Sequence, residues 1–147
     1  MNKKIIFWEP YFFIFFGLFH LHRIWGLINK ESYTSFWLDL LHNRGPLYFI
    51  LMAILTILCI LGIITFIRNI KNNYWWRYVY LIGGGYLLFD LCAILYKFDF
   101  WYKLLDFMFD TSSNWYVIFL LMFILIGAFS FGIGISLIIK NKKNKKD

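Results

Sequence analysis

Five ionisable side chains have types and positions in this sequence that suit chemistry: His20, Arg23, His42, Arg44 and Asp90. Histidine transfers protons near neutral pH, and the planar guanidinium of arginine matches the geometry of a phosphate. A carboxylate inside an apolar segment, such as that of Asp90, needs a partner or water. These residue types would suit proton transfer or the binding of a lipid phosphate, and we treat the five as a candidate polar cluster.

Three members of this cluster are expected at nearly the same depth. His20 and Arg23 are three residues apart, so they would face one way on a helix. Counting along each apolar segment puts His20, Arg23 and Asp90 about 7–12 Å below the same end of the helices. We therefore predict that Asp90 pairs with Arg23, His20 or both, either as a structural contact or as part of a functional site.

The remaining motifs carry weaker signals. The pair His42-x-Arg44 is a candidate for holding a lipid phosphate. His20 and His22 are two residues apart and would point in nearly opposite directions on a helix, so we predict no metal there. The sequence has no Gly-x-Ser-x-Gly, no phosphate-binding loop and no His-Glu-x-x-His motif. We expect no cofactor, and the catalytic residues, if the protein has any, stay unassigned.

Four apolar segments must position these side chains. They cover residues 10–28, 46–67, 78–96 and 115–139, and about 20 helical residues cross the hydrocarbon core of a bilayer. The chain is 61% hydrophobic with a mean hydropathy of +0.65, whereas a soluble domain is about half apolar. The expected fold is an all-α bundle of four transmembrane helices that forms a single membrane domain over residues 1–147, with an uncleaved first span.

Basic residues are distributed unevenly between the two sides of this predicted bundle. Ten lie before the first span, between the second and third, and after the fourth: Lys3, Lys4, Arg68, Lys71, Arg77, Lys140, Lys142, Lys143, Lys145 and Lys146. The positive-inside rule then predicts that both termini are cytoplasmic. This asymmetry accounts for most of the net charge of +7, so no nucleic-acid partner is expected. Residues 140–147 would anchor the chain to anionic lipid.

Two connections on the opposite side have the pattern of short amphipathic helices. In residues 98–110, the polar side chains of Asp99, Lys103, Asp106 and Asp110 are spaced by four, three and four. Residues 32–42 have the same character. We expect both segments to lie in the outer headgroup layer, where they either seal the bundle or form a lid over a site.

Small residues predict where helices approach closely. Ala128, Gly132 and Ser136 recur at intervals of four in the last span, and residues 83–85 are three consecutive glycines. Small side chains at such spacing allow helix backbones to come together in a membrane. We expect helix contacts at both places.

The sequence favours one function and leaves two alternatives open. The first is a non-catalytic accessory, immunity or assembly factor that acts through helix contacts with a membrane protein or a second copy. The second is an enzyme that handles lipid or quinone, with its site at His20, Arg23 and Asp90. The third is a small oligomeric transporter or channel. A composition rich in Lys, Asn, Ile and Phe fits a bacterium, whose plasma membrane would hold this multi-pass chain.

Overall fold

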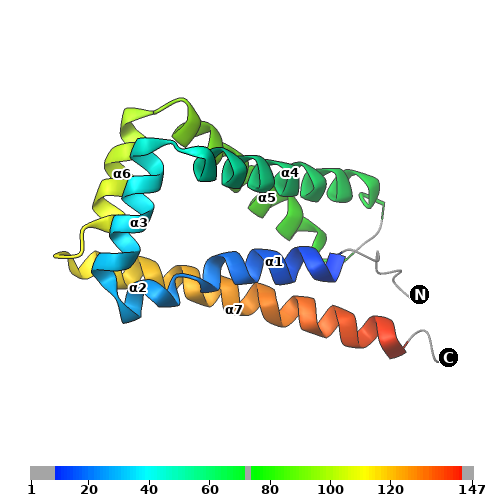
Figure 1. Ribbon diagram of the computed structural model, residues 1–147. Helices are drawn as coiled ribbons and strands as arrows, with labels where there is room; N and C mark the ends of the chain where they lie inside the picture. Colours follow the sequence, from blue (N-terminus) through cyan, green and yellow to red (C-terminus); the bar gives the residue numbers. More distant parts are fainter. Residues whose placement is uncertain (1–8, 72–73, 144–147) are drawn as a thin grey trace. The chain divides into compact units, whose positions relative to one another are not determined.

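The computed structural model describes residues 9–71 and 74–143, and these residues form helices and short turns without β-strands. Seven helices follow one another along this part of the chain (Figure 1): α1 (Glu9–Leu21), α2 (Ile24–Ile28), α3 (Lys30–Asn43), α4 (Pro46–Arg68), α5 (Arg77–Leu95), α6 (Asp99–Phe109) and α7 (Asn114–Lys143). The predicted all-α class is confirmed. Lys3, Lys4, Lys145 and Lys146 lie outside the described residues.

Four helical segments are long and apolar enough to cross a membrane. They are Glu9–Ile28, which combines α1 and α2, then Pro46–Arg68, Arg77–Leu95 and Asn114–Lys142. Their bounds agree with the predicted spans to within a few residues. Most side chains of these helices are apolar, and many large apolar side chains are exposed. The exposed fractions of Ile82 and Leu125, for example, are 70% and 69%. Such surfaces are stable when lipid or another helix covers them.

The helices group into two compact units. One contains the described residues up to Ser35 together with those from Asp110 onward, and the other is Phe36–Phe109. The first unit is built on α1, α2 and α7, and the second on α4, α5, α6 and the second half of α3.

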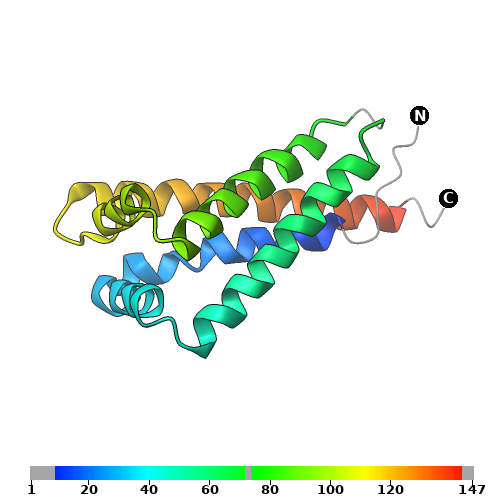
Figure 2. The ribbon, with the colours of Figure 1, turned by 90° about the horizontal axis from the view of Figure 1, so that it is seen from above.

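In the first unit, α1 lies alongside α7 in an antiparallel arrangement (Figure 1 and Figure 2). A Cβ added to Gly127 would come within 2.9 Å of the Gly17 carbonyl, and one added to Gly134 within 2.9 Å of the Pro10 carbonyl. Between these glycines, the hydroxyl of Ser130 donates a hydrogen bond of 2.9 Å to the carbonyl of Phe13. Small residues therefore bring these two backbones into contact, as is common between membrane helices.

The contact stripe on α7 differs from the predicted one. Gly127, Ser130 and Gly134 are buried, whereas Ala128, Gly132 and Ser136 are exposed, and a Cβ added to Gly132 would meet nothing within 4 Å. Two stripes of small residues run along α7 only about 100° apart. The prediction chose the four-residue spacing, but the stripe that contacts α1 has steps of three and four.

A tight turn interrupts the first span at His22 and Arg23. The amides of Arg23 and Gly26 donate to carbonyls three residues earlier, at His20 and Arg23, which is the narrower 3₁₀ pattern. Beyond the turn, the hydroxyl of Tyr116 on α7 donates to the Gly26 carbonyl at 3.1 Å. The predicted single helix is thus two helices, α1 and α2, both of which pack against α7.

In the second unit, α4 and α5 form an antiparallel pair (Figure 2), and their backbones approach closely at Gly84. A Cβ at Gly84 would lie 3.3 Å from the Cys59 carbonyl, whereas one at Gly85 would meet nothing within 4 Å. The expected helix contact at the glycine run is therefore made by Gly84. No break in α5 accompanies the three glycines, since the helix is continuous from Arg77 to Leu95.

The predicted amphipathic segments are helices, α3 and α6. A cluster of apolar side chains joins the second half of α3 to α6 and to the adjoining ends of α4 and α5. It comprises Leu40, Leu41, Tyr48 and Ile94, with Trp37, Leu51, Met52, Trp101, Leu105 and Phe109 packed around them. This cluster fixes α6 beside the C-terminal end of α5, where most of the candidate polar residues of this unit lie.

Candidate functional site

His20 and Arg23, which the spacing predicted to face one way, are in contact in the first unit. The Arg23 Nη1 lies 3.3 Å from the His20 Nδ1. A guanidinium has donors only, so this geometry makes Nδ1 the acceptor and puts the proton of a neutral imidazole on Nε2. The turn that follows α1 allows this contact, because it places Arg23 about one helical turn after His20.

Aromatic rings surround this pair. His20 is buried, with ring centroids of Phe16 at 4.4 Å and Phe123 at 5.6 Å. The Arg23 guanidinium lies over the Phe123 ring at 4.4 Å and over Phe19 at 5.7 Å. A cation over an aromatic face is stabilised by the ring quadrupole, most strongly where water is excluded. The aromatic rings around His20 thus form a packed environment that holds the Arg23 guanidinium in place, and they do not form an open polar channel.

His22 points elsewhere, as expected for residues two apart on a helix. Its Nδ1 bonds to the Phe19 carbonyl, and its ring lies 5.7 Å from that of Tyr33 on α3. Because a carbonyl only accepts, Nδ1 of His22 must carry the proton, the opposite tautomer to that of His20. Burial raises the pKa of Tyr33 to about 12, so its ring presents a neutral phenol to His22.

Asp90 is held by a residue that the sequence did not single out as its partner. The indole Nε1 of Trp101, on α6, donates a 2.5 Å hydrogen bond to the Asp90 Oδ1. The same indole packs edge-on against Phe89, with ring centroids 5.2 Å apart. A buried tryptophan N–H normally finds an acceptor, and this is the signal that could have connected the two residues.

Arg44 stands at the C-terminal end of α5. Its Nη2 donates to the Ile94 carbonyl at 2.8 Å and to the Leu95 carbonyl at 3.3 Å, and lies 3.4 Å from the Tyr102 hydroxyl. The hydrogen bond with Tyr102 raises the pKa of Arg44, so the guanidinium stays charged. A cation at a helix C-terminus is favoured by the helix dipole and satisfies carbonyls that lack a helical partner.

His42 is exposed on the last turn of α3, and its Nδ1 bonds to the Leu38 carbonyl at 2.7 Å. Its ring lies 6.2 Å from that of Tyr102, the phenol that also bonds to Arg44. His42 and Arg44 thus share a neighbour on α6 that the sequence did not indicate. The exposed His42 ring therefore lies near the residue that also bonds to the Arg44 guanidinium.

The five predicted residues fall into two groups. His20 and Arg23 belong to the first unit, whereas His42, Arg44 and Asp90 belong to the second. The predicted contact between Asp90 and Arg23 or His20 would join the two units, and it stays a prediction. In the residues that the structure describes, three or more His, Cys, Asp or Glu side chains nowhere gather as metal ligands would.

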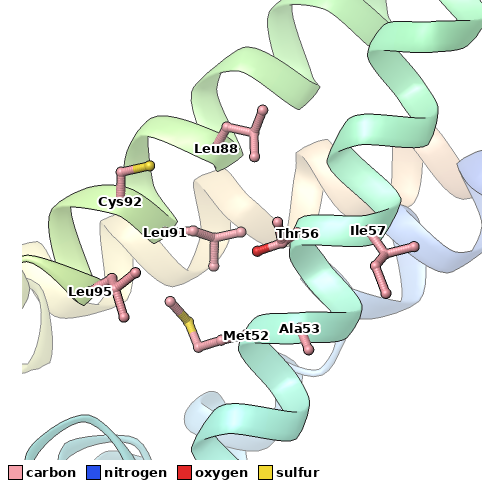
Figure 3. A pocket seen from close by; sticks show the side chains of 8 residues that line it. All are labelled: Met52, Ala53, Thr56, Ile57, Leu88, Leu91, Cys92 and Leu95. Carbon is pink, nitrogen blue, oxygen red and sulfur yellow. The ribbon is translucent and has the colours of Figure 1, made fainter.

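A pocket of about 350 Å³ opens between α4 and α5 in the second unit (Figure 3). Its walls are almost entirely apolar, with the Thr56 hydroxyl and the Cys92 thiol as the polar groups. The lining residues are Met52, Ala53, Thr56, Ile57, Leu88, Leu91, Cys92 and Leu95. Ligand sites are commonly of this size and this apolar character, and none of these residues was in the predicted cluster.

Comparison with known proteins gives no assignment, since no family model, no curated protein and no solved structure matches this chain.

Proposed function

We propose that this chain is a non-catalytic multi-pass membrane protein, an accessory, immunity or assembly factor that acts through helix contacts. The observation that supports it is the use of polar side chains within each unit. Asp90 bonds to Trp101, Arg44 to the end of α5, and Ser130 to the backbone of α1. The bonds of Asp90 and Ser130 each join two helices, and the bond of Arg44 joins the α3–α4 connection to α5. These are structural uses of polar groups in a membrane.

The proposed topology has both termini in the cytoplasm of a bacterium. Arg68, Lys71 and Arg77 lie around the α4–α5 turn, and Lys140 and Lys142 lie in the last turns of α7. If the four candidate spans each cross the membrane once, chain order puts both groups on the side of the termini. The opposite connections carry Glu31, Asp39, Asp99, Asp106 and Asp110 beside fewer basic residues. This asymmetry supports a plasma membrane location with α3 and α6 in the outer headgroup layer.

Photo-cross-linking in living cells tests the proposal. A photoreactive amino acid is placed at Ile82 of α5 or at Leu125 of α7, which are 70% and 69% exposed. The expected result is a discrete adduct with one membrane protein, or with a second copy, from at least one of these faces. Leu120, which is 5% exposed on α7, is the matched position that should give no intermolecular adduct.

A second experiment, on the purified chain, would recognise an enzymatic function. The purified chain in nanodiscs is incubated with bacterial phospholipid and menaquinone, and the products are followed by mass spectrometry. Turnover that His20→Gln abolishes, together with adducts to lipid alone at both exposed positions, would overturn the non-catalytic proposal. It would favour the second candidate, lipid handling, for which the pocket between α4 and α5 is the supporting observation.

A further inference from the structure

The pocket between α4 and α5 has one end that is basic. Leu95 lines the pocket, and its carbonyl lies 3.3 Å from the Arg44 Nη2. The amide of Lys97 donates at 3.3 Å to the Ile94 carbonyl, which also accepts from Arg44 at 2.8 Å. Arg44 through its guanidinium and Lys97 through its backbone amide therefore both contact the last carbonyls of α5. These carbonyls adjoin Leu95, which lines the pocket (Figure 3).

Both cationic residues have an uncommon backbone conformation. Arg44 has a φ of 45° and Lys97 a φ of 54°, and among the described residues these are the non-glycine residues with positive φ. A left-handed residue commonly ends a helix. Lys97 ends α5 in this way, with its amide bonded to the Ile94 carbonyl and the amide of Phe98 bonded to the Ala93 carbonyl, and Arg44 directly follows α3. The two helix ends therefore fix the backbone of both basic residues near one end of the pocket.

We propose that this groove binds one anionic phospholipid, with an acyl chain between α4 and α5 and the phosphate at Arg44 and Lys97. Within the described residues, the three hydrogen bonds of the Arg44 side chain all use Nη2, which leaves the Nη1 donors for a phosphate oxygen. Guanidinium groups suit this role because their planar donors match phosphate geometry. The site lies wholly in the second unit and does not depend on the function proposed above.

The dimensions of the groove fit this occupant. Leu88 and Leu95 mark its two ends on α5, and seven residues of helix correspond to about 10 Å. One leaflet contributes roughly half of a hydrocarbon core about 30 Å thick, so the groove covers about two-thirds of that depth. Arg44 and Lys97 lie two residues outside the ends of α4 and α5, at the level where a headgroup begins. A helix from a second copy would use the apolar walls but would gain nothing from two cations.

Native mass spectrometry of the full, delipidated chain tests the site. The probes are dioleoylphosphatidylglycerol and dioleoylphosphatidylcholine, which share acyl chains and differ in charge. We expect tighter binding of the glycerol lipid, by roughly fivefold for each cation that contacts the headgroup. Lys97→Asn should lower that affinity roughly fivefold without disturbing the Arg44 hydrogen bonds, because asparagine accepts a positive φ.

Matched variants separate the headgroup from net charge. Arg44→Asn combined with Lys97→Asn should remove most of the preference for the anionic lipid. Arg68→Asn combined with Lys71→Asn removes the same charge at the opposite end of α4, where both residues are exposed, and should leave the preference unchanged. Asp99→Asn removes an exposed acid two residues after Lys97 and should strengthen binding of the anionic lipid.

A second variant tests the acyl chain. Ala53→Phe puts a ring into the groove and should weaken binding of both lipids, whereas Ile54→Phe on the exposed side of α4, outside the lining, should not. Equal binding of the two lipids by the unaltered chain would overturn the proposal, and so would unchanged binding in Ala53→Phe. If millimolar inorganic phosphate displaces the lipid, the site binds free anions and the proposal is overturned. If Cys92 forms disulfides between two copies, the groove is a dimer contact and the proposal is likewise overturned.

Discussion

The indole nitrogen of Trp101 donates to the carboxylate of Asp90 at 2.5 Å, and this bond joins α6 to α5 within one unit. A carboxylate inside a membrane span is costly unless it is neutral, paired or in water. Trp101 supplies one hydrogen-bond partner for this carboxylate, and it does so from the amphipathic helix α6 instead of from another span. Asp90 therefore acts in the attachment of α6, whatever further contacts it makes.

Replacing Trp101 tests this attachment. Trp101→Phe keeps most of the ring packing but removes the N–H, and it should lower the free energy of unfolding by about 1–3 kcal/mol. Equilibrium unfolding in mixed micelles, followed by circular dichroism, measures the change. Trp75→Phe is the control, since Trp75 is 58% exposed and should have little effect. Equal losses in the two variants would show that the indole N–H contributes nothing specific.

The predicted pairing of Asp90 with Arg23 calls for a charge exchange. If the two residues pair, Asp90→Arg and Arg23→Asp should each destabilise the chain, because each single change puts two like charges together. The double variant should then recover roughly 0.5–3 kcal/mol relative to the sum of the single effects. Strict additivity would argue against the contact. If the pair is only structural, the protein should keep its function when the two charges are exchanged, whereas an enzyme or transporter should lose activity. If Asp90→Asn changes neither folding nor function, the hypothesis of a polar cluster is wrong.

The glycine contact between α1 and α7 predicts a difference between two neighbouring substitutions. Gly127→Ala places a methyl group 2.9 Å from the Gly17 carbonyl, whereas Gly132→Ala meets nothing within 4 Å. The first should cost about 1–3 kcal/mol through overpacking, and the second should change stability by no more than about 0.5 kcal/mol. Thermal unfolding of the two variants in the same detergent makes the comparison. The reverse order would mean that α7 packs on α1 through the other stripe.

The hydroxyl of Ser130 provides a smaller and more local test. Ser130→Ala removes the 2.9 Å bond to the Phe13 carbonyl, and bonds of this type between membrane helices contribute about 0.6 kcal/mol on average. We expect a loss of about that size in the free energy of unfolding. Ser136→Ala, at an exposed position two turns later on α7, should leave stability unchanged. A loss at Ser136 as large as that at Ser130 would contradict the observed contact.

The turn before α7 has a predicted pH dependence. Hydrogen bonds from the Ser112 hydroxyl at 2.6 Å and the Ser112 amide at 3.0 Å hold the pKa of the Asp110 carboxyl below its usual value. A pKa that folding lowers gives stability that is complete above the unfolded value of about 3.9 and is lost as the pH falls through the folded value. Ser112→Ala should raise the pKa of Asp110, as measured by carboxyl ¹³C titration. Ser113→Ala is the control, because its hydroxyl accepts from Trp115 instead, and an equal shift there would contradict the assignment.

Much of the local structure was accessible from residue types alone. The lengths of the apolar runs predicted four spans, and the four-three-four spacing of Asp99, Lys103, Asp106 and Asp110 predicted the helix that became α6. The spacing of His20 and Arg23 predicted that they face one way, and the structure adds that their side chains are in contact. The interruption at His22 and Arg23 was not predicted, because neither proline nor glycine stands at the turn. The structure shows it between two helices, α1 and α2, that both pack against α7.

The sequence by itself determined the all-helical class and the four long apolar helices, because hydrophobicity and helical periodicity are local properties. Tertiary structure alone decided which polar groups meet within a unit. Trp101 reaches Asp90 because the apolar cluster around Ile94 holds α6 beside α5. Arg44 reaches the Ile94 carbonyl from fifty residues away because α3 turns into α4 at that level. The pocket between α4 and α5 likewise depends on where the two helices cross, and no spacing along the chain encodes that angle.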